Sequence, residues 1–325
     1  MYQKRQWIFL QKVCAMDTEK SGTIFILIGL LVYGIHPIIV EFGGMIVAPL
    51  VFASTAALIA GCVALVLARR TTPPINRDIS RSDTKRLVMA GVLGTFLAFA
   101  CFFIGLQFTS SNNAAVILRS ELVFALLFGF LFLDETISKR QAVLMTIMLV
   151  GVLLVLATTQ LTTISFGDIL ILITPVAWAA GHTFAKPTLQ RVAPWTVVTY
   201  RNLVGGTLLL LLAGILLWLG TPIILVPNLG LVVGVILIET IVILLAHGLW
   251  YEGISRINLG KATALIAPAP LVTFLLSTLI FQIPPTIWQL LGALIVILST
   301  ILLSREVSLR RTSGSRRIRK HKEPA

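Results

Sequence analysis

The chain has 325 residues, of which 57% are hydrophobic and 12% are charged, and its formal net charge at pH 7 is +13. Soluble domains carry roughly 25% charged residues, so this composition excludes an ordinary water-soluble domain. A basic chain can bind nucleic acid, but here the charges flank apolar runs and the aromatic residues lie inside those runs. The composition therefore indicates a membrane protein whose partner is the lipid bilayer, with no nucleic-acid partner.

Apolar runs of membrane-spanning length recur from Ser21 to Ser304 with short breaks. A helix needs about 20 apolar residues to cross a hydrocarbon layer of ~30 Å. The sequence therefore predicts an all-α integral membrane protein with ten transmembrane helices. In chain order, these are expected at about 22–41, 46–68, 87–108, 112–133, 141–158, 168–186, 194–218, 228–250, 262–281 and 286–304.

Basic residues are distributed unevenly between the predicted loops. All but two of the 26 Lys and Arg residues fall on one side of the membrane, and the exceptions are Arg119 and Arg201. Because cytoplasmic loops are enriched in Lys and Arg, both termini are predicted to be cytoplasmic, in a multi-pass protein of the cell membrane. Residues 1–20 then form a cytoplasmic N-terminal segment, and residues 305–325 form a basic cytoplasmic tail.

Residues 21–158 and residues 159–304 look like two copies of one five-helix unit. At an offset of 145 residues, Val-Ala-Pro at 47–49 coincides with an identical Val-Ala-Pro at 192–194. Because five is odd, the second copy is predicted to be inverted relative to the first. Inverted repeats are common in secondary transporters, whose substrate sites lie near the membrane midplane between the repeats.

Two segments are typical of the ends of such repeats in one transporter family. Residues 113–135 run from Asn-Ala-Ala to Leu-Phe-Leu-Asp-Glu, and residues 261–272 run from Lys-Ala-Thr to Pro-Leu-Val. With these segments and Arg201, the chain resembles the EamA-type carriers of the drug/metabolite transporter superfamily. The resemblance covers about residues 22–304. It implies two inverted five-helix repeats that carry small molecules.

Three charged residues lie well inside the predicted helices: Arg119, Glu121 and Glu239. A charged side chain at the centre of a membrane helix costs about 2.5–3.5 kcal/mol, so these residues are predicted to face a polar cavity or each other. Arg119 is a candidate clamp for a substrate carboxylate because its guanidinium presents a fork of donors. The alternative is a structural tie to Glu121 or Glu239. The two-residue spacing predicts that Arg119 and Glu121 lie on nearly opposite helix faces.

Glu239 shares a predicted helix face with Trp250, and His247 borders that face. A buried carboxylate suits reversible binding of a coupling proton. The alternative is a buried pair with an arginine. Arg201 lies near the start of its predicted helix, so it is expected to extend toward the inner membrane surface in a structural role.

Equivalent helices of the two repeats each carry an aromatic residue and a histidine on one face. These pairs are Tyr33 with His36 and Trp178 with His182, at spacings of three and four residues. Prolines lie near both pairs and are predicted to break the helices, as often happens at transporter sites. The pairs predict a wall for an amphipathic or ring-containing substrate. The alternative is packing between helices.

The sequence holds no motif for ATP binding, for a zinc protease or for a serine nucleophile. The four histidines are dispersed and the three cysteines are scattered. We therefore expect no catalytic residues, no metal and no cofactor, and energy supplied by a substrate or ion gradient.

These observations predict a secondary transporter of a small metabolite, such as an amino acid or a related amphipathic compound, working by alternating access. The family resemblance favours export; proton coupling remains open, as does the choice between monomer and homodimer. Alternatives are efflux of lipophilic drugs, a membrane enzyme acting on a lipid-linked substrate, and a scaffold or sensor. The predicted substrate-binding residues are Tyr33, His36, Arg119, Glu121, Trp178, His182, Glu239, His247 and Trp250.

Overall fold

The computed structural model describes most of the chain as helices joined by short turns. The described residues are 2–70, 79–132, 137–156, 165–220, 226, 228–257, 262 and 265–320. Residues 133–135, 261, 263 and 264 of the two repeat-end segments lie outside this part, as do the side chains of 307–325 in the basic tail. No β-strand occurs among the described residues.

Helices occupy the first half of the chain wherever the sequence predicts an apolar run. Two of them contain irregular turns, the π-helical turn η1 and the 3-10 turn η2. In chain order the elements are α1 (Tyr2–Gly44), α2 (Pro49–Arg70), α3 (Arg81–Gly91), η1 (Val92–Leu97), α4 (Ala98–Gly105), α5 (Ser111–Ile117), η2 (Leu118–Ser120), α6 (Glu121–Phe132) and α7 (Lys139–Leu156).

The second half of the chain is likewise helical. Side chains at the starts of several helices accept hydrogen bonds from free backbone N–H groups, among them Ser165 before α8 and Asn228 before α10. The elements are α8 (Phe166–Ala185), the 3-10 turn η3 (Lys186–Gln190), α9 (Pro194–Trp218), α10 (Leu229–Arg256), α12 (Ala269–Phe281) and α13 (Ile287–Lys320).

Within the described residues, seven helices are long and apolar enough to cross a membrane, and the two shorter apolar helices are Ala269–Phe281 and Ile287–Leu303. The protein is therefore a multi-pass membrane protein. The regular helix α12 begins at Ala269, later than the predicted start at Ala262. Pro268 precedes it and Pro270 lies in its first turn. A proline at this place needs no N–H donor, so it marks a helix start.

The prediction that prolines break two helices is wrong. α1 continues through Pro37 and α8 continues through Pro175. The irregular turns lie instead at η1 and η2, and at η1 a side chain of α9, Arg201, donates to the carbonyl of Gly94.

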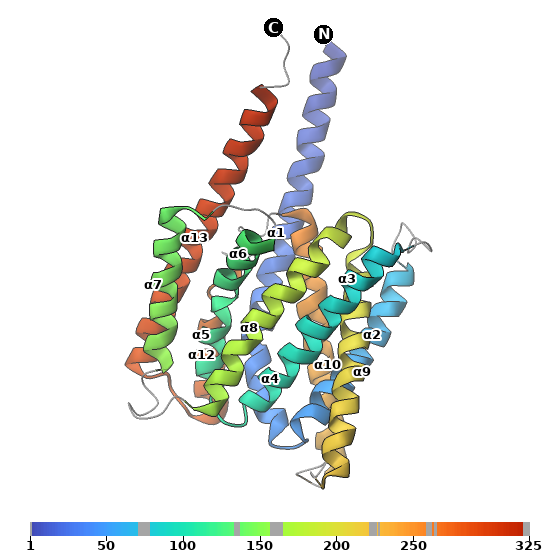
Figure 1. The fold of residues 1–325 in the computed structure, drawn as a ribbon, viewed down its shortest axis with the longest axis vertical. Coiled ribbons are helices and arrows are strands. Elements are labelled where there is room, and N and C mark those ends of the chain that lie inside the picture. Colours follow the sequence, from blue (N-terminus) through green and yellow to red (C-terminus); the bar gives the residue numbers. More distant parts are fainter. Residues whose placement is uncertain are drawn as a thin grey trace.

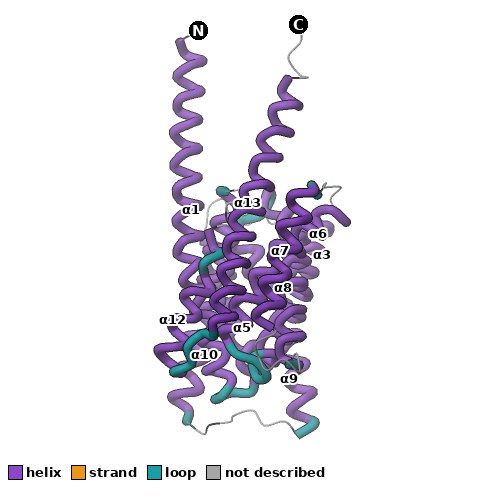
Figure 2. Tube along the Cα trace, turned by 90° about the vertical axis from the view of Figure 1, so that its left-hand side faces the viewer, coloured by secondary structure: helices purple, strands orange, loops and turns teal. Residues whose placement is uncertain are grey.

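The packing of the helices relates the two halves of the chain. α2 packs on α9, α5 on α12, and α7 on α13, while the pair α1–α10 has its counterpart in α8 packed on α4 and η1. The start of α1 and the end of α13 project from the same end of the bundle (Figures 1 and 2). Because α1, α8, α10 and the η2 region meet in the interior, this packing determines where the polar side chains gather.

Candidate functional site

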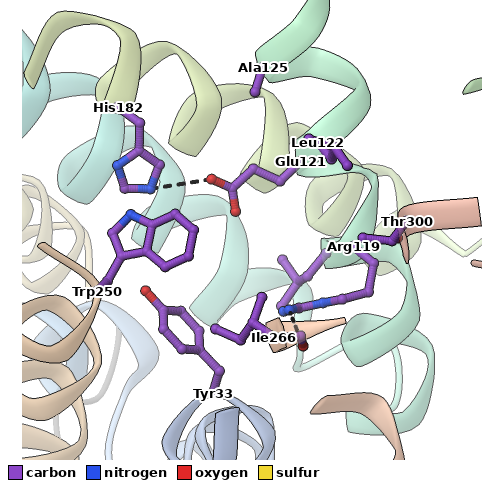
Figure 3. Close-up of a pocket in the computed structure, with 10 residues that line it drawn as sticks. Tyr33, Arg119, Glu121, Leu122, Ala125, His182, Trp250, Ile266 and Thr300 are labelled. Atoms are coloured by element: carbon purple, nitrogen blue, oxygen red, sulfur yellow. Dashed lines mark hydrogen bonds and ion pairs between the residues drawn. The ribbon is translucent and has the colours of Figure 1, made fainter. Parts of the chain in front are cut away.

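A pocket opens among helices from both halves of the chain (Figure 3). Its polar and aromatic walls come from Tyr33 on α1, Arg119 on η2, Glu121 on α6, His182 on α8 and Trp250 on α10. Counted with the open space at its mouth, it encloses about 560 Å³ that protein atoms do not fill. The remaining lining residues are Leu118, Leu122, Ala125, Ile266 and Thr300.

A second, smaller hollow adjoins the first, because Tyr33, Glu121 and His182 line both. Its volume is about 310 Å³, again with open space included. Its other lining residues are His36, Phe99, Trp178, Arg201, Ile243, Ala246 and His247. The structure thus brings every predicted substrate-binding residue except Glu239 to the lining of one or both hollows.

Glu239 lies behind the smaller hollow and is fully buried, at 0% exposure. Its Oε1 atom lies 2.8 Å from Nε2 of His36, and its Oε2 has no hydrogen-bond partner among the described residues. The alternative prediction, that Glu239 pairs with an arginine, is therefore wrong, because the observed partner is His36. Glu239 can affect the hollow through His36, which lines it.

Glu121 faces both hollows, with 26% of its side chain exposed. Its Oε1 atom lies 3.3 Å from Nε2 of His182, a contact that joins α6 to α8 and so links the two halves. Figure 3 shows its other carboxylate oxygen turned toward the space between Trp250 and Arg119. One oxygen of Glu121 is therefore available to a ligand.

Arg119 lines the same pocket as Glu121, contrary to the prediction of opposite helix faces. The reason is the 3-10 turn η2, in which the helix has 3.0 residues per turn. Positions two apart then diverge by about 120° rather than the roughly 160° of an α-helix. Arg119 donates from Nη1 to the carbonyl of Ile266 at 3.4 Å, and its Nε has no partner in the described part of the chain.

The predicted structural ties from Arg119 to Glu121 or Glu239 are not among the ion pairs that the described residues form. Arg119 is 9% exposed, and among the described residues it makes a single long hydrogen bond. A buried donor without a partner is unfavourable. Arg119 is therefore suited to bind an anionic group in the pocket.

Aromatic rings border the polar groups. Tyr33 and Trp250 meet edge to face, with ring centroids 6.2 Å apart, and Trp250 lies 5.7 Å from the ring of His182. Trp178 packs against Phe102 at 6.1 Å on the wall of the smaller hollow. The site therefore combines charged groups with flat apolar surfaces.

Arg201 does not extend toward the membrane surface as predicted. It is 1% exposed and donates to the carbonyl of Gly94 at 2.6 Å, to Oγ1 of Thr95 at 3.1 Å and to the hydroxyl of Tyr251 at 3.1 Å. The acceptors on η1 and α10 hold it inside the bundle, where it lines the smaller hollow.

The sequence analysis did not assign Arg201 and Tyr251 to the site. Tyr251 is fully buried, and its hydroxyl also contacts Nδ1 of His182 at 3.1 Å. The available signal was Arg201 itself, because a second arginine inside an apolar run requires partners. Nothing in the local sequence distinguishes Tyr251 from an ordinary packing residue.

A polar pocket walled by the helices of a multi-pass membrane protein is the arrangement expected of a membrane transporter. The sequence profile of the EamA-like transporter family matches residues 20–157 and again residues 165–305. The chain belongs to the EamA-like transporter family.

Curated relatives agree with this family. The chain is 25% identical to "Uncharacterized transporter YyaM" of Bacillus subtilis (strain 168), over 72% of this chain and 77% of that protein. It is 22% identical to "Probable amino-acid metabolite efflux pump" of Salmonella typhimurium, over 86% of this chain and 93% of that protein. A protein of known crystal structure is 17% identical, with a TM-score of 0.64 over 89% of this chain and 99% of that one. At this identity, the likeness to the solved structure shows a shared fold.

Proposed function

We propose that the protein is a secondary transporter that exports a small amphipathic metabolite, such as an amino acid, across the cell membrane. The observation that carries this proposal is the pocket in which Arg119 and Glu121 face one space beside Tyr33 and Trp250. Arg119 has donors, and Glu121 an oxygen, that are left for a ligand. A cation and a carboxylate facing one space are complementary to a molecule with both a negative and a positive end.

Each end of such a substrate has a designated partner. The guanidinium of Arg119 donates to the substrate's carboxylate, and the free oxygen of Glu121 accepts from its ammonium group. The rings of Tyr33 and Trp250 cover its apolar body. The name of the Salmonella relative supports an amino acid as the first compound to test.

Transport follows from alternating access between two inverted five-helix repeats in ten crossings, with both termini cytoplasmic. The packing supports this arrangement. Exchanging the two halves of the chain exchanges α1–α10 with α8–α4 and leaves the pairs α2–α9, α5–α12 and α7–α13 unchanged. A substrate shifts the balance between inward and outward states only if it contacts the two states differently, and a pocket shared by both halves provides such contacts.

The contact between His36 and Glu239 supplies a proton site for coupling. It joins α1 to α10 beside the smaller hollow, and the second carboxylate oxygen has no partner within the described residues. A proton bound by His36 or Glu239 changes the charge at the contact between α1 and α10. Because this contact joins the two halves of the chain, its change of charge couples the pH gradient to the exchange between inward and outward states.

The test is uptake into proteoliposomes containing the purified protein, for a panel of amino acids, related metabolites and lipophilic drugs, with and without a pH gradient. We expect at least one amphipathic metabolite to enter faster than it enters empty vesicles. Uptake of lipophilic drugs alone would support the alternative of drug efflux. If no compound on the panel enters faster than in empty vesicles, the proposal fails.

A further inference from the structure

A chain of contacts leads from the pocket to the π-helical turn η1. Glu121 lies 3.3 Å from Nε2 of His182, and Nδ1 of the same ring lies 3.1 Å from the hydroxyl of Tyr251. That hydroxyl accepts from Nη1 of Arg201 at 3.1 Å, and Nη2 of Arg201 donates to the carbonyl of Gly94 at 2.6 Å. The contacts cross α6, α8, α10, α9 and η1 in turn.

The π turn explains why Arg201 is held at this place. In an α-helix the N–H of Ala98 would bond to the carbonyl of Gly94, but here it bonds to the carbonyls of Leu93 and Thr95 instead. The Gly94 carbonyl is thereby left free of its usual donor, and Arg201 fills the position. Thr95 on the same turn accepts a further bond from Nε of Arg201, so the guanidinium is fixed at two points before it reaches Tyr251.

The donors and acceptors that each group can offer determine which group donates in each of these contacts. Arginine only donates hydrogen bonds, so the Tyr251 oxygen is an acceptor toward Arg201. Among the described residues, the only other hydrogen-bond partner of this fully buried hydroxyl is Nδ1 of His182. If Nδ1 also carried a hydrogen, two donors would point at one oxygen and the hydroxyl hydrogen would have no acceptor, which is unfavourable in a buried site. The Tyr251 hydroxyl must therefore donate to Nδ1.

From this geometry we infer that Arg201 and Tyr251 are positioning residues that hold His182 as the neutral tautomer with its hydrogen on Nε2. Nε2 of His182 lies 3.3 Å from Oε1 of Glu121. His182 thus keeps one carboxylate oxygen oriented toward α8 and leaves the other for the substrate. The inference rests on the proposed function only where it assigns one oxygen of Glu121 to the substrate. The tautomer of His182 is a property of the protein without substrate.

Other titratable or charged groups border the same hollows and belong in the interpretation of any pH effect. They are Tyr33 and His36 on α1, Arg119 on η2, Arg201 on α9 and His247 on α10. A spectroscopic measurement of the His182 ring distinguishes its tautomer from the titration of these neighbours.

The experiment is nitrogen-15 NMR of protein labelled with ¹⁵N-histidine, in lipid bilayers at neutral pH and without substrate. The protein has four histidines, and His182→Gln identifies the signals of His182 by their loss. We expect a protonated Nε2 and an unprotonated Nδ1 in the wild type. A hydrogen on Nδ1 of the wild-type ring, with or without one on Nε2, would overturn the inference.

Two substitutions test the origin of the tautomer. Tyr251→Phe removes the donor to Nδ1, so we expect loss of the single tautomer and the appearance of signals from a protonated Nδ1. Tyr200→Phe makes the same change on α9 outside both hollows, and should leave the His182 signals unchanged. Unaltered His182 signals in Tyr251→Phe would contradict the positioning role.

Arg201→Lys gives an independent readout, because lysine keeps the charge but cannot reach Gly94 and Tyr251 together with a rigid fork. We expect partial loss of the single tautomer. The wild-type spectrum decides the matter even where a variant does not fold. Since no substrate is present, a failure of the transport assay leaves this result intact, and a wrong tautomer leaves the proposed transport standing.

Discussion

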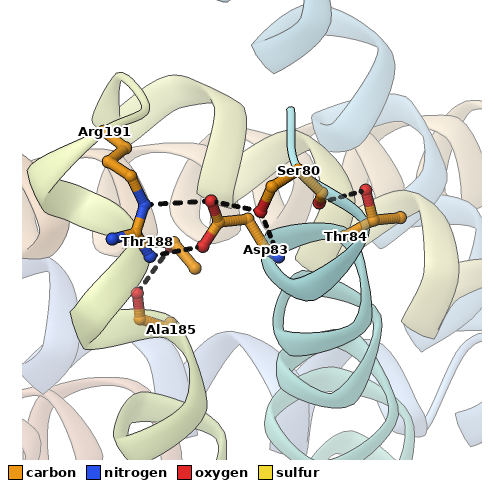
Figure 4. Close-up of polar contacts among 6 residues, drawn as sticks. All are labelled: Ser80, Asp83, Thr84, Ala185, Thr188 and Arg191. Atoms are coloured by element: carbon orange, nitrogen blue, oxygen red, sulfur yellow. Dashed lines mark hydrogen bonds and ion pairs between the residues drawn. The ribbon is translucent and has the colours of Figure 1, made fainter. Parts of the chain in front are cut away.

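Carboxylates meet basic side chains in two regions of the protein, at the contact between Asp83 and Arg191 and at the carboxylate–histidine contacts of the pocket. The two regions differ in how many of the carboxylate oxygens have a hydrogen-bond partner. Asp83 accepts two hydrogen bonds from Arg191, from Nε at 3.0 Å and from Nη2 at 2.7 Å, and a third from Ser80 at 2.8 Å (Figure 4). Ser80 in turn caps α3 by accepting from the N–H of Asp83. Every oxygen of this carboxylate has a partner.

The pocket contacts are incomplete. Glu121 and Glu239 each use one oxygen toward a histidine, and Arg119 has one long hydrogen bond. Hydrogen bonding to Asp83 raises the pKa of Arg191, which lies in the turn after η3, so Arg191 stays charged. The difference indicates that the complete pair holds α3 to the η3 turn, whereas the incomplete ones have capacity left for a ligand.

Removing the charge of Glu121 should have the largest effect on transport. Glu121→Gln keeps the size of the side chain but removes the negative charge opposite the substrate's positive end. A hydrogen bond to a charged group contributes about 1.5–3 kcal/mol, and tenfold corresponds to about 1.4 kcal/mol. We therefore expect the initial rate of uptake into proteoliposomes to fall roughly ten- to a hundredfold.

Glu252→Gln is the matched control for Glu121→Gln. Glu252 pairs with Arg256 one turn further along α10, and it lines neither hollow. We expect this variant to retain the wild-type rate. Equal losses in the two variants would contradict a specific role for Glu121 in the pocket.

The next largest effect, here on stability, is expected from substituting Gly181, where α8 crosses closely over η1. A Cβ atom added at Gly181 would lie 2.8 Å from Cα and 2.9 Å from N of Gly94, and these backbone atoms cannot move aside cheaply. We expect Gly181→Ala to lower the free energy of unfolding by about 1–3 kcal/mol, measured by thermal unfolding in detergent. Gly214→Ala, with nothing within 4 Å of the added atom, should be neutral or slightly stabilising.

The smallest effect on transport is expected at the complete pair. Asp83→Asn removes the charge opposite Arg191, whose side chain is 53% exposed and therefore partly screened by solvent. We expect a loss of about 1 kcal/mol in stability, with an unchanged uptake rate per folded molecule. A large drop in uptake with unaltered thermal stability would show that this pair takes part in transport.

The positions of the helices could be predicted because long apolar runs have few alternatives in a membrane. The charged pocket residues could be predicted for the same reason, since an arginine or glutamate inside such a run requires a polar surrounding. Thus Arg119, Glu121 and His182 were found from the sequence, together with the aromatic residues on the matching helix faces.

The irregular turns could not be predicted, because they depend on contacts between distant segments. The π turn at Val92–Leu97 is completed by Arg201, which lies 107 residues beyond Gly94 in the chain. The 3-10 turn that turns Arg119 toward Glu121 is equally invisible in the local pattern. For the same reason, Arg201 was assigned to the membrane surface and Tyr251 was missed.

The most direct test of the account is whether the pocket around Glu121 is an aqueous site. In a protein whose three cysteines are replaced by serine, Ala125→Cys places a thiol on the pocket wall, and Ile241→Cys places one on the outer face of α10, where Ile241 is 55% exposed. The measurement is the rate of labelling by a water-soluble maleimide in proteoliposomes. The account predicts rapid labelling at position 125 and little at position 241; a thiol at position 125 as unreactive as the one at position 241 would contradict it.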